Sequence, residues 1–97
     1  MSENDKSNES AAVDVPDQLT IILRKPVTLG SETYDSITVN EPTVGQIEAF
    51  AKESDRVHPL QAMNNLVATV SGVNKAAINL MSARDGKKAR DFLANFL

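Results

Sequence analysis

The 97-residue sequence contains no cysteine and no tryptophan, and it has only one histidine and one tyrosine. The absence of cysteine excludes a disulfide framework and any thiolate metal site. No apolar run approaches the ~18–20 residues that a membrane-spanning helix requires. The amino-terminal residues also lack the basic and apolar regions of a signal peptide. We therefore expect a protein that is neither secreted nor inserted in a membrane.

The charge balance is slightly acidic and uneven along the chain. The 13 acidic and 10 basic side chains give a formal net charge of -3, which is unusual for a protein that binds a phosphate backbone. Residues 1–17 carry five acidic side chains against one lysine and few large apolar ones, too few to offset the entropy of ordering. The sequence predicts a disordered acidic tail over residues 1–17 and a single small domain over residues 18–97.

An alternating apolar pattern predicts a β-hairpin over about residues 19–39. In the first strand Leu19, Ile21 and Leu23 share one face. A Gly-Ser-Glu turn and a second strand follow. Pro26 is expected at an edge or bend, because proline cannot donate a ladder hydrogen bond. Two strands alone are marginal in water, so one face must pack on helices while the outer edges stay open.

The apolar period changes to about 3.6 after the hairpin, which predicts three to four short α-helices over about residues 43–97. Thr43 and Gln46 have the spacing of a capping box, which places the first helix start at Thr43. Helix caps and first turns are expected at four further positions, Pro59, Gly72, Asn74 and Ser82. The predicted fold class is α+β, a two-stranded antiparallel hairpin followed by these helices.

Two apolar stripes with helical spacing supply the candidate partner-binding residues. Their members are Leu60, Met63, Val67 and Val70 in one helix, and Phe92, Leu93, Phe96 and Leu97 at the end of the chain. Most residues at such spacings, about two thirds, are expected to form the domain's own core. A groove that covers a partner helix presents the same spacing of anchors. We expect the second stripe to be partly exposed, because it reaches the last residue without a polar cap.

The sequence offers little catalytic chemistry. The only imidazole, His58, precedes Pro59 and is expected to be an exposed loop residue or a helix cap. Glu32 and Asp35 flank Tyr34 and are more typical of a solvated turn than of an acid–base pair. Zinc needs three or four ligands at local spacing, and no segment provides them. The sequence predicts no enzyme activity, no cofactor and no metal site.

Arg84, Lys87 and Lys88 form a basic cluster near the end of the chain. Gly86 precedes the two lysines as in a phosphate-binding loop, but the earlier glycine and the Ser or Thr of that motif are missing. At roughly 100° per residue the cluster is predicted opposite the second stripe, as the solvated face of an amphipathic helix. We therefore expect neither a nucleic-acid partner nor a membrane partner.

Three segments of the chain together resemble one protein family. Residues 22–30 read ILRKPVTLG, residues 37–45 read ITVNEPTVG, and residues 91–97 read DFLANFL. The pattern is similar to that of the E-like or Mu-type tail assembly chaperones of contractile-tailed phages and prophages. Asn40 and Gln46 depart from it, at positions where a basic and an acidic residue are common in the family.

The resemblance implies a chaperone rather than an enzyme. Such proteins bind the tape measure protein in the cytoplasm of the bacterial host, keep it soluble and help to recruit tail tube protein. They are absent from the mature virion. Many also exist in a longer form made by translational frameshift, so that form and a homo-oligomer are further expected partners. The resemblance implies no cofactor.

Two other functions stay open. Short helices joined near Gly72, together with the basic residues of 84–90, also occur in small DNA-binding regulators with a helix-turn-helix. A minor structural protein of the tail or baseplate is the second alternative. It differs from a chaperone by remaining in purified particles.

Overall fold

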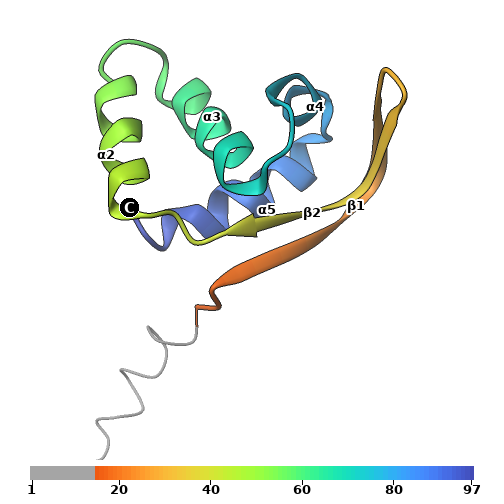
Figure 1. Ribbon diagram of the computed structural model, residues 1–97, viewed down its shortest axis with the longest axis horizontal. Helices are drawn as coiled ribbons and strands as arrows, with labels where there is room; N and C mark the ends of the chain where they lie inside the picture. Colours follow the sequence, from red (N-terminus) through yellow and green to blue (C-terminus); the bar gives the residue numbers. More distant parts are fainter. Residues whose placement is uncertain (1–14) are drawn as a thin grey trace, which may run out of the picture.

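A computed structural model describes residues 15–97 of the chain (Figure 1). Two β-strands precede four α-helices, which confirms the predicted α+β order of a hairpin and short helices. The elements are β1 Gln18–Leu29, β2 Glu32–Asn40, α2 Val44–Glu53, α3 Pro59–Ser71, α4 Lys75–Leu80 and α5 Ala83–Ala94. Residues 1–14 of the predicted acidic tail lie outside the described residues.

β1 and β2 form the antiparallel hairpin that the alternating pattern predicts. Gly30 and Ser31 make the turn between them. Gly30 takes a φ of 62°, which a residue without a Cβ adopts at little cost. One face of the hairpin is buried through Ile21, Leu23, Val27, Ile37 and Val39.

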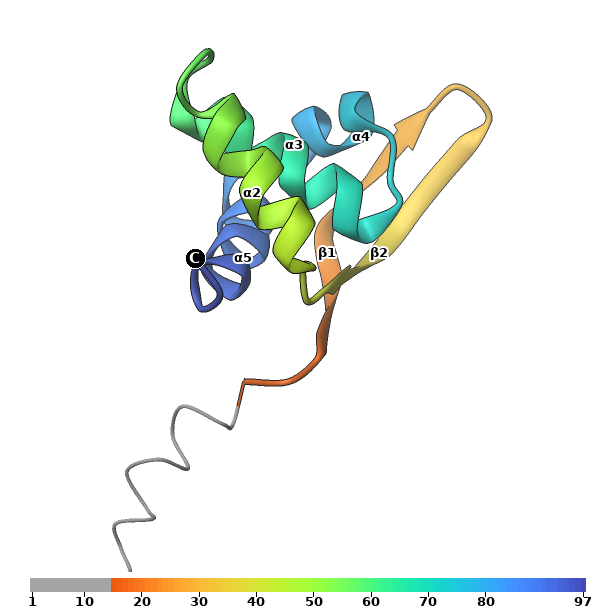
Figure 2. The ribbon, with the colours of Figure 1, turned by 60° about the vertical axis from the view of Figure 1, so that its left-hand side comes forward.

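The other face of the hairpin carries paired threonines. The hydroxyl oxygens of Thr20 and Thr38 are 3.0 Å apart, and those of Thr28 and Thr33 are 3.2 Å apart. Ile22 is an apolar exception, and 72% of its surface is exposed. Both ribbon views place the four helices on the opposite side of the hairpin (Figures 1 and 2), so none of these four covers the threonine face.

A bulge interrupts β1 around Pro26, where a bend was expected. The register breaks between Ile22 and Val27, so four residues of β1 stand opposite one residue of β2. Within the bulge, Arg24 donates its main-chain N–H to Oδ2 of Asp85 at 2.9 Å. Asp85 belongs to the first turn of α5 and is fully buried. This hydrogen bond therefore ties the bulge of β1 to the start of the last helix.

The caps of α2 and α3 confirm the predicted helix ends. The Thr43 hydroxyl accepts from the Gln46 N–H at 3.1 Å, and the Gln46 side chain accepts from the Thr43 N–H at 2.9 Å. His58 caps α3, with its Nδ1 accepting from the Leu60 N–H at 3.0 Å. Gly72 ends α3 at a φ of 70°, in the left-handed conformation typical of glycine after a helix.

Asn74 and Ser82 cap α4 and α5 as predicted, but the last helix is shorter than the apolar spacing indicated. It ends at Ala94 and does not continue to Leu97. The last three N–H groups of the chain bond three residues back rather than four. The Asn95 side-chain amide also donates to two carbonyls of the final turn. These bonds satisfy carbonyls that a helix end leaves free, so the helix stops there.

The core lies between the buried face of the hairpin and three helices. α4 and α5 pack on β1, and α3 packs on β2. α2 contacts α3 and buries none of its own residues, so it forms an outer layer (Figure 2). The helices contribute Leu66, Val67, Val70, Ala77, Ile78, Ala89, Phe92 and Leu93 to the core.

Candidate functional site

The first predicted stripe divides between core and surface. Val67 and Val70 are buried in the core between α3 and the hairpin. Met63 is half-buried at the margin of that core. Leu60, in the first turn of α3, is 49% exposed. It lines an open depression of about 510 Å³ between α3 and α4, whose other residues are polar or charged. Leu60 is therefore the member of this stripe that is most open to a partner.

The second stripe divides in the same way along α5. Phe92 and Leu93 are buried in the core. Phe96 is half-buried and meets Phe92 edge to face, with ring centroids 5.3 Å apart and ring planes at 75°. Leu97 is 48% exposed. Exposure therefore increases along the stripe, and the residues accessible to a partner are those past the end of the helix.

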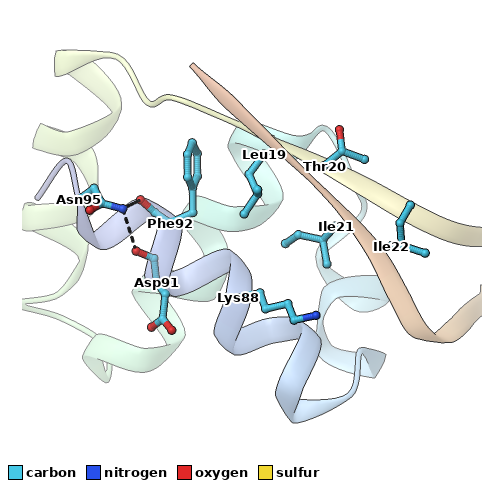
Figure 3. Close-up of a pocket in the computed structure, with 8 residues that line it drawn as sticks. All are labelled: Leu19, Thr20, Ile21, Ile22, Lys88, Asp91, Phe92 and Asn95. Atoms are coloured by element: carbon cyan, nitrogen blue, oxygen red, sulfur yellow. Dashed lines mark hydrogen bonds between the residues drawn. The ribbon is translucent and has the colours of Figure 1, made fainter. Parts of the chain in front are cut away.

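A groove that the sequence analysis did not identify lies beside Phe92, between β1 and α5 (Figure 3). It is open, has a volume of about 640 Å³ and exposes mostly apolar surface. Its lining residues are Leu19, Thr20, Ile21 and Ile22 from β1, Lys88, Asp91 and Phe92 from α5, and Asn95, the C-cap of α5. The sequence contains one signal for this groove, Ile22, because it is an apolar residue out of phase with the alternation of its strand.

The α5 wall of the groove carries charged side chains at its rim. Lys88 lies one turn before Phe92 and lines the same groove, so the prediction that Lys88 lies opposite the apolar stripe is wrong. Four residues of an α-helix return to within about 40° of the starting direction. Asp91 forms an ion pair with Lys87 at 2.8 Å. The Asn95 amide donates to the main-chain oxygens of Asp91 and Phe92 at 3.3 and 3.0 Å (Figure 3).

Two buried side-chain oxygens in residues 15–97 have no hydrogen-bond partner, namely Oδ1 of Asp85 and Oδ1 of Asn65. The second oxygen of Asp85 accepts from Arg24. The amide nitrogen of Asn65 donates to Glu53 at 2.7 Å and joins α3 to α2. Neither residue lines the groove between β1 and α5. The hydrogen bonds of both side chains join elements of the fold to one another.

The titratable residues of the described chain form no chemical centre. No group of three or more His, Cys, Asp or Glu side chains in residues 15–97 is placed to hold a metal ion. His58 is the exposed cap of α3, as expected. The hydroxyl of Tyr34 donates to Glu32 at 2.7 Å. That hydrogen bond raises the pKa of Tyr34, with further contributions from desolvation and from the Glu32 charge.

Among the helices of residues 15–97, none combines the length and apolarity that spanning a bilayer requires.

A family model matches most of the chain. It is described as phage tail assembly chaperone proteins, E, or 41 or 14, and it covers residues 20–97. The matched region contains most of β1, all of β2 and the four helices. The searches of curated proteins and of solved structures gave no match.

Proposed function

Because the chain belongs to the phage tail assembly chaperone family, we propose that it binds the tape measure protein and keeps that protein soluble during tail assembly. Membership in this family indicates a role in assembly rather than in catalysis. The proposal extends to the recruitment of tail tube protein, to action in the cytoplasm of the bacterial host, and to absence from the mature virion. A longer frameshifted form and further copies of the chain are proposed as additional partners.

The groove between β1 and α5 is the observation that carries the proposal. A protein that keeps another soluble must present apolar surface that its own core does not cover. Ile22 at the groove is 72% exposed, whereas Phe92 forms an apolar wall held in place by the core. Phe92 is therefore fixed by the core, and the Ile22 side chain, on the threonine face at the β1 edge of the groove, is free to be covered.

Exposed members of the two predicted stripes provide further apolar surface outside the groove. Leu60, Leu97 and the half-buried Phe96 remain accessible. Full burial of one such side chain contributes about 1.5–3 kcal/mol, and a micromolar complex needs about 8 kcal/mol. Association also costs several kcal/mol in lost freedom. Several apolar contacts, rather than one stripe alone, are therefore required for a stable complex.

Co-expression with the tape measure protein encoded in the same phage or prophage tests the proposal. We expect the tape measure protein to be soluble and to co-purify with the chain, and to be insoluble without it. Absence of co-purification, or a tape measure protein that is equally soluble alone, would contradict the proposal. Mass spectrometry of purified tails gives a second test, because a chain retained in finished tails is a structural component.

A matched pair of substitutions connects the binding to the groove. Ile22 and Val44 are exposed to nearly the same extent, 72% and 76%. Val44 occupies the first position of α2, where an acidic side chain suits the helix dipole. We expect Ile22→Glu to weaken co-purification at least tenfold and Val44→Glu to leave it unchanged. Equal effects of both substitutions would place the contact elsewhere.

A further inference from the structure

The groove runs along the edge of β1 rather than across its face. Its β1 wall consists of four consecutive residues, Leu19 to Ile22. Side chains on one face of a strand come from every second residue, so a wall of consecutive residues follows the strand's edge. In the described part of the chain β1 pairs with β2 on one side and with no strand on the other. The groove therefore combines an open strand edge with the side of a helix.

The register shows which main-chain groups point toward that open edge. Opposite residues of an antiparallel pair alternate between pairs that exchange hydrogen bonds and pairs that do not. The Glu41 N–H donates to the Asp17 oxygen at 2.8 Å, and the register continues from Gln18 opposite Asn40. Residues 19 and 21 therefore bond to β2. The N–H and C=O groups of Gln18, Thr20 and Ile22 face away from it.

The edge is open over a short stretch only. Natural edge strands are protected from pairing by lysine, proline and bulges. In β1 these features occur from Arg24 onward, in the bulge around Pro26. Asp85 accepts from the Arg24 N–H and so occupies, at that residue, the place of an added strand. Between Gln18 and Ile22 no such protection exists within the strand.

We propose that an extended segment of the tape measure protein adds to this edge as a third strand, with its side chains in the groove against α5. The inference rests on the proposed function and specifies how the partner is held. Four residues of β1 span about 13 Å, and Lys88 to Asn95 span about 10 Å along α5 and its C-cap, so the groove takes a segment of four to six residues. A helix cannot occupy it equally well, because its main-chain groups are already bonded and leave the edge unpaired.

Charge complementarity specifies one side chain of the incoming segment. Lys88 lines the groove, while the neighbouring Asp91 is paired with Lys87. Among residues 15–97 this is the one ion pair within 4 Å, so Lys88 has no ion-pair partner of its own in this part of the chain. An acidic residue in the added strand is therefore favoured beside Lys88. The other side chains facing the groove meet Leu19 and Phe92 and are expected to be apolar.

A second copy of the chain fits this edge less well. Symmetric pairing of two β1 strands places them about 4.8 Å apart. Each strand brings its own α5 to the same side of the joined sheet, beside the same edge. Packed helices need about 8–10 Å between their axes. Two paired copies would therefore bring two α5 helices into competition for the space beside one edge, whereas a single extended segment brings no second helix.

Amide hydrogen exchange on the purified complex tests the strand addition directly. We expect the N–H groups of Thr20 and Ile22 to exchange at least tenfold more slowly in the complex than in the free chain. Those of Leu19 and Ile21 already bond to β2 and should change little. A complex in which Thr20 and Ile22 keep their free exchange rates contradicts strand addition. Protection that grows with the concentration of the chain alone indicates self-pairing and also contradicts it.

Proline substitutions at two paired threonines provide a matched control. Thr20→Pro removes an N–H from the groove edge, and Thr38→Pro removes the equivalent N–H from the opposite edge of the hairpin. Both remove the same hydroxyl contact between the two residues. We expect Thr20→Pro to weaken binding of the tape measure protein at least tenfold relative to Thr38→Pro. Equal affinities would overturn the inference.

The two hypotheses fail in distinguishable ways. If the wild-type chain does not bind the tape measure protein, the proposed function is wrong. If it binds without protecting Thr20 and Ile22, the proposed function stands and strand addition is wrong. Should Thr20→Pro fail to fold, Lys88→Glu tests the same groove from its α5 wall. It is expected to weaken binding at least threefold, and an unchanged affinity would contradict the charge argument.

Discussion

The main-chain N–H of Arg24 and the buried carboxylate of Asp85 are joined by a 2.9 Å hydrogen bond across 61 residues of sequence. This bond connects the irregular part of β1 to the first turn of α5, and so ties together the two elements that form the walls of the groove. Oδ1 of the same carboxylate has no hydrogen-bond partner among residues 15–97. A buried carboxylate with one satisfied oxygen is retained here at an energetic cost.

Asp85→Ala is expected to destabilise the fold. The substitution leaves the Arg24 N–H without its partner, and an unsatisfied main-chain donor costs about 1–3 kcal/mol. Chemical denaturation measures the change. Asp91→Ala is the control, because its ion pair with Lys87 is exposed and such pairs contribute about 0–1 kcal/mol. If Asp85→Ala lowers the free energy of unfolding no more than Asp91→Ala does, the hydrogen bond between Arg24 of β1 and Asp85 of α5 contributes little to stability.

Leucines at two positions of the second stripe separate core packing from partner binding. Leu93→Ala removes a fully buried side chain and is expected to lower the free energy of unfolding by about 2–5 kcal/mol. Leu97 is 48% exposed, so Leu97→Ala should leave the thermal midpoint within a few degrees of wild type. We expect Leu97→Ala to reduce co-purification of the tape measure protein. Unchanged co-purification would show that Leu97 does not belong to the surface that binds the partner.

Gly86→Ala is expected to stabilise α5. Gly86 lies in the first turn of the helix at an ordinary φ, where alanine is favoured over glycine by about 0.8–1 kcal/mol. An added Cβ would approach the terminal nitrogen of Arg90 at 3.1 Å. That nitrogen ends a flexible side chain, and within residues 15–97 it makes one long hydrogen bond, 3.4 Å to Asn64. A lower thermal midpoint would show that the position of Arg90 matters more than helix propensity.

The pKa of Tyr34 should depend on Glu32. The hydroxyl donates to the Glu32 carboxylate, which favours the neutral phenol and raises the pKa above its ordinary value of 10.0. The bond is therefore present below that value and is lost as the pH rises through the raised pKa. We expect Glu32→Ala to lower the midpoint of the phenolate absorbance titration. The chain has one tyrosine and no tryptophan, so the signal belongs to Tyr34, and an unshifted midpoint would contradict this assignment.

Local chemistry was sufficient to predict most of the secondary structure. The capping box of Thr43 and Gln46 and the glycine at 72 act through atoms within a few residues, so their spacing identifies the helix ends. The hairpin followed from the alternation of apolar residues in two segments around one turn. The end of α5 was missed because Asn95 satisfies the final carbonyls with its side chain, an effect that apolar spacing does not contain.

The candidate site was less accessible to sequence reasoning. The groove depends on the sideways placement of α5 relative to β1, which packing of Phe92 and Leu93 under the hairpin decides. Asp85 has the sequence appearance of an ordinary charge in a first helical turn, and only the bulge of β1 explains its burial. Ile22 was the residue that indicated an exposed apolar surface in the sequence, because an apolar residue on the threonine face of the strand does not contribute to the core.

The turn at Gly30 and Ser31 offers a practical handle for the experiments above. Both residues are exposed, nothing lies within 4 Å of a side chain built at Gly30, and the hairpin tip extends past the helices in Figure 2. A fluorophore attached through a cysteine placed at Ser31 would sit at the far end of β1 from the groove. Because the chain has no cysteine of its own, such labelling would be site-specific and would report partner capture without obstructing it.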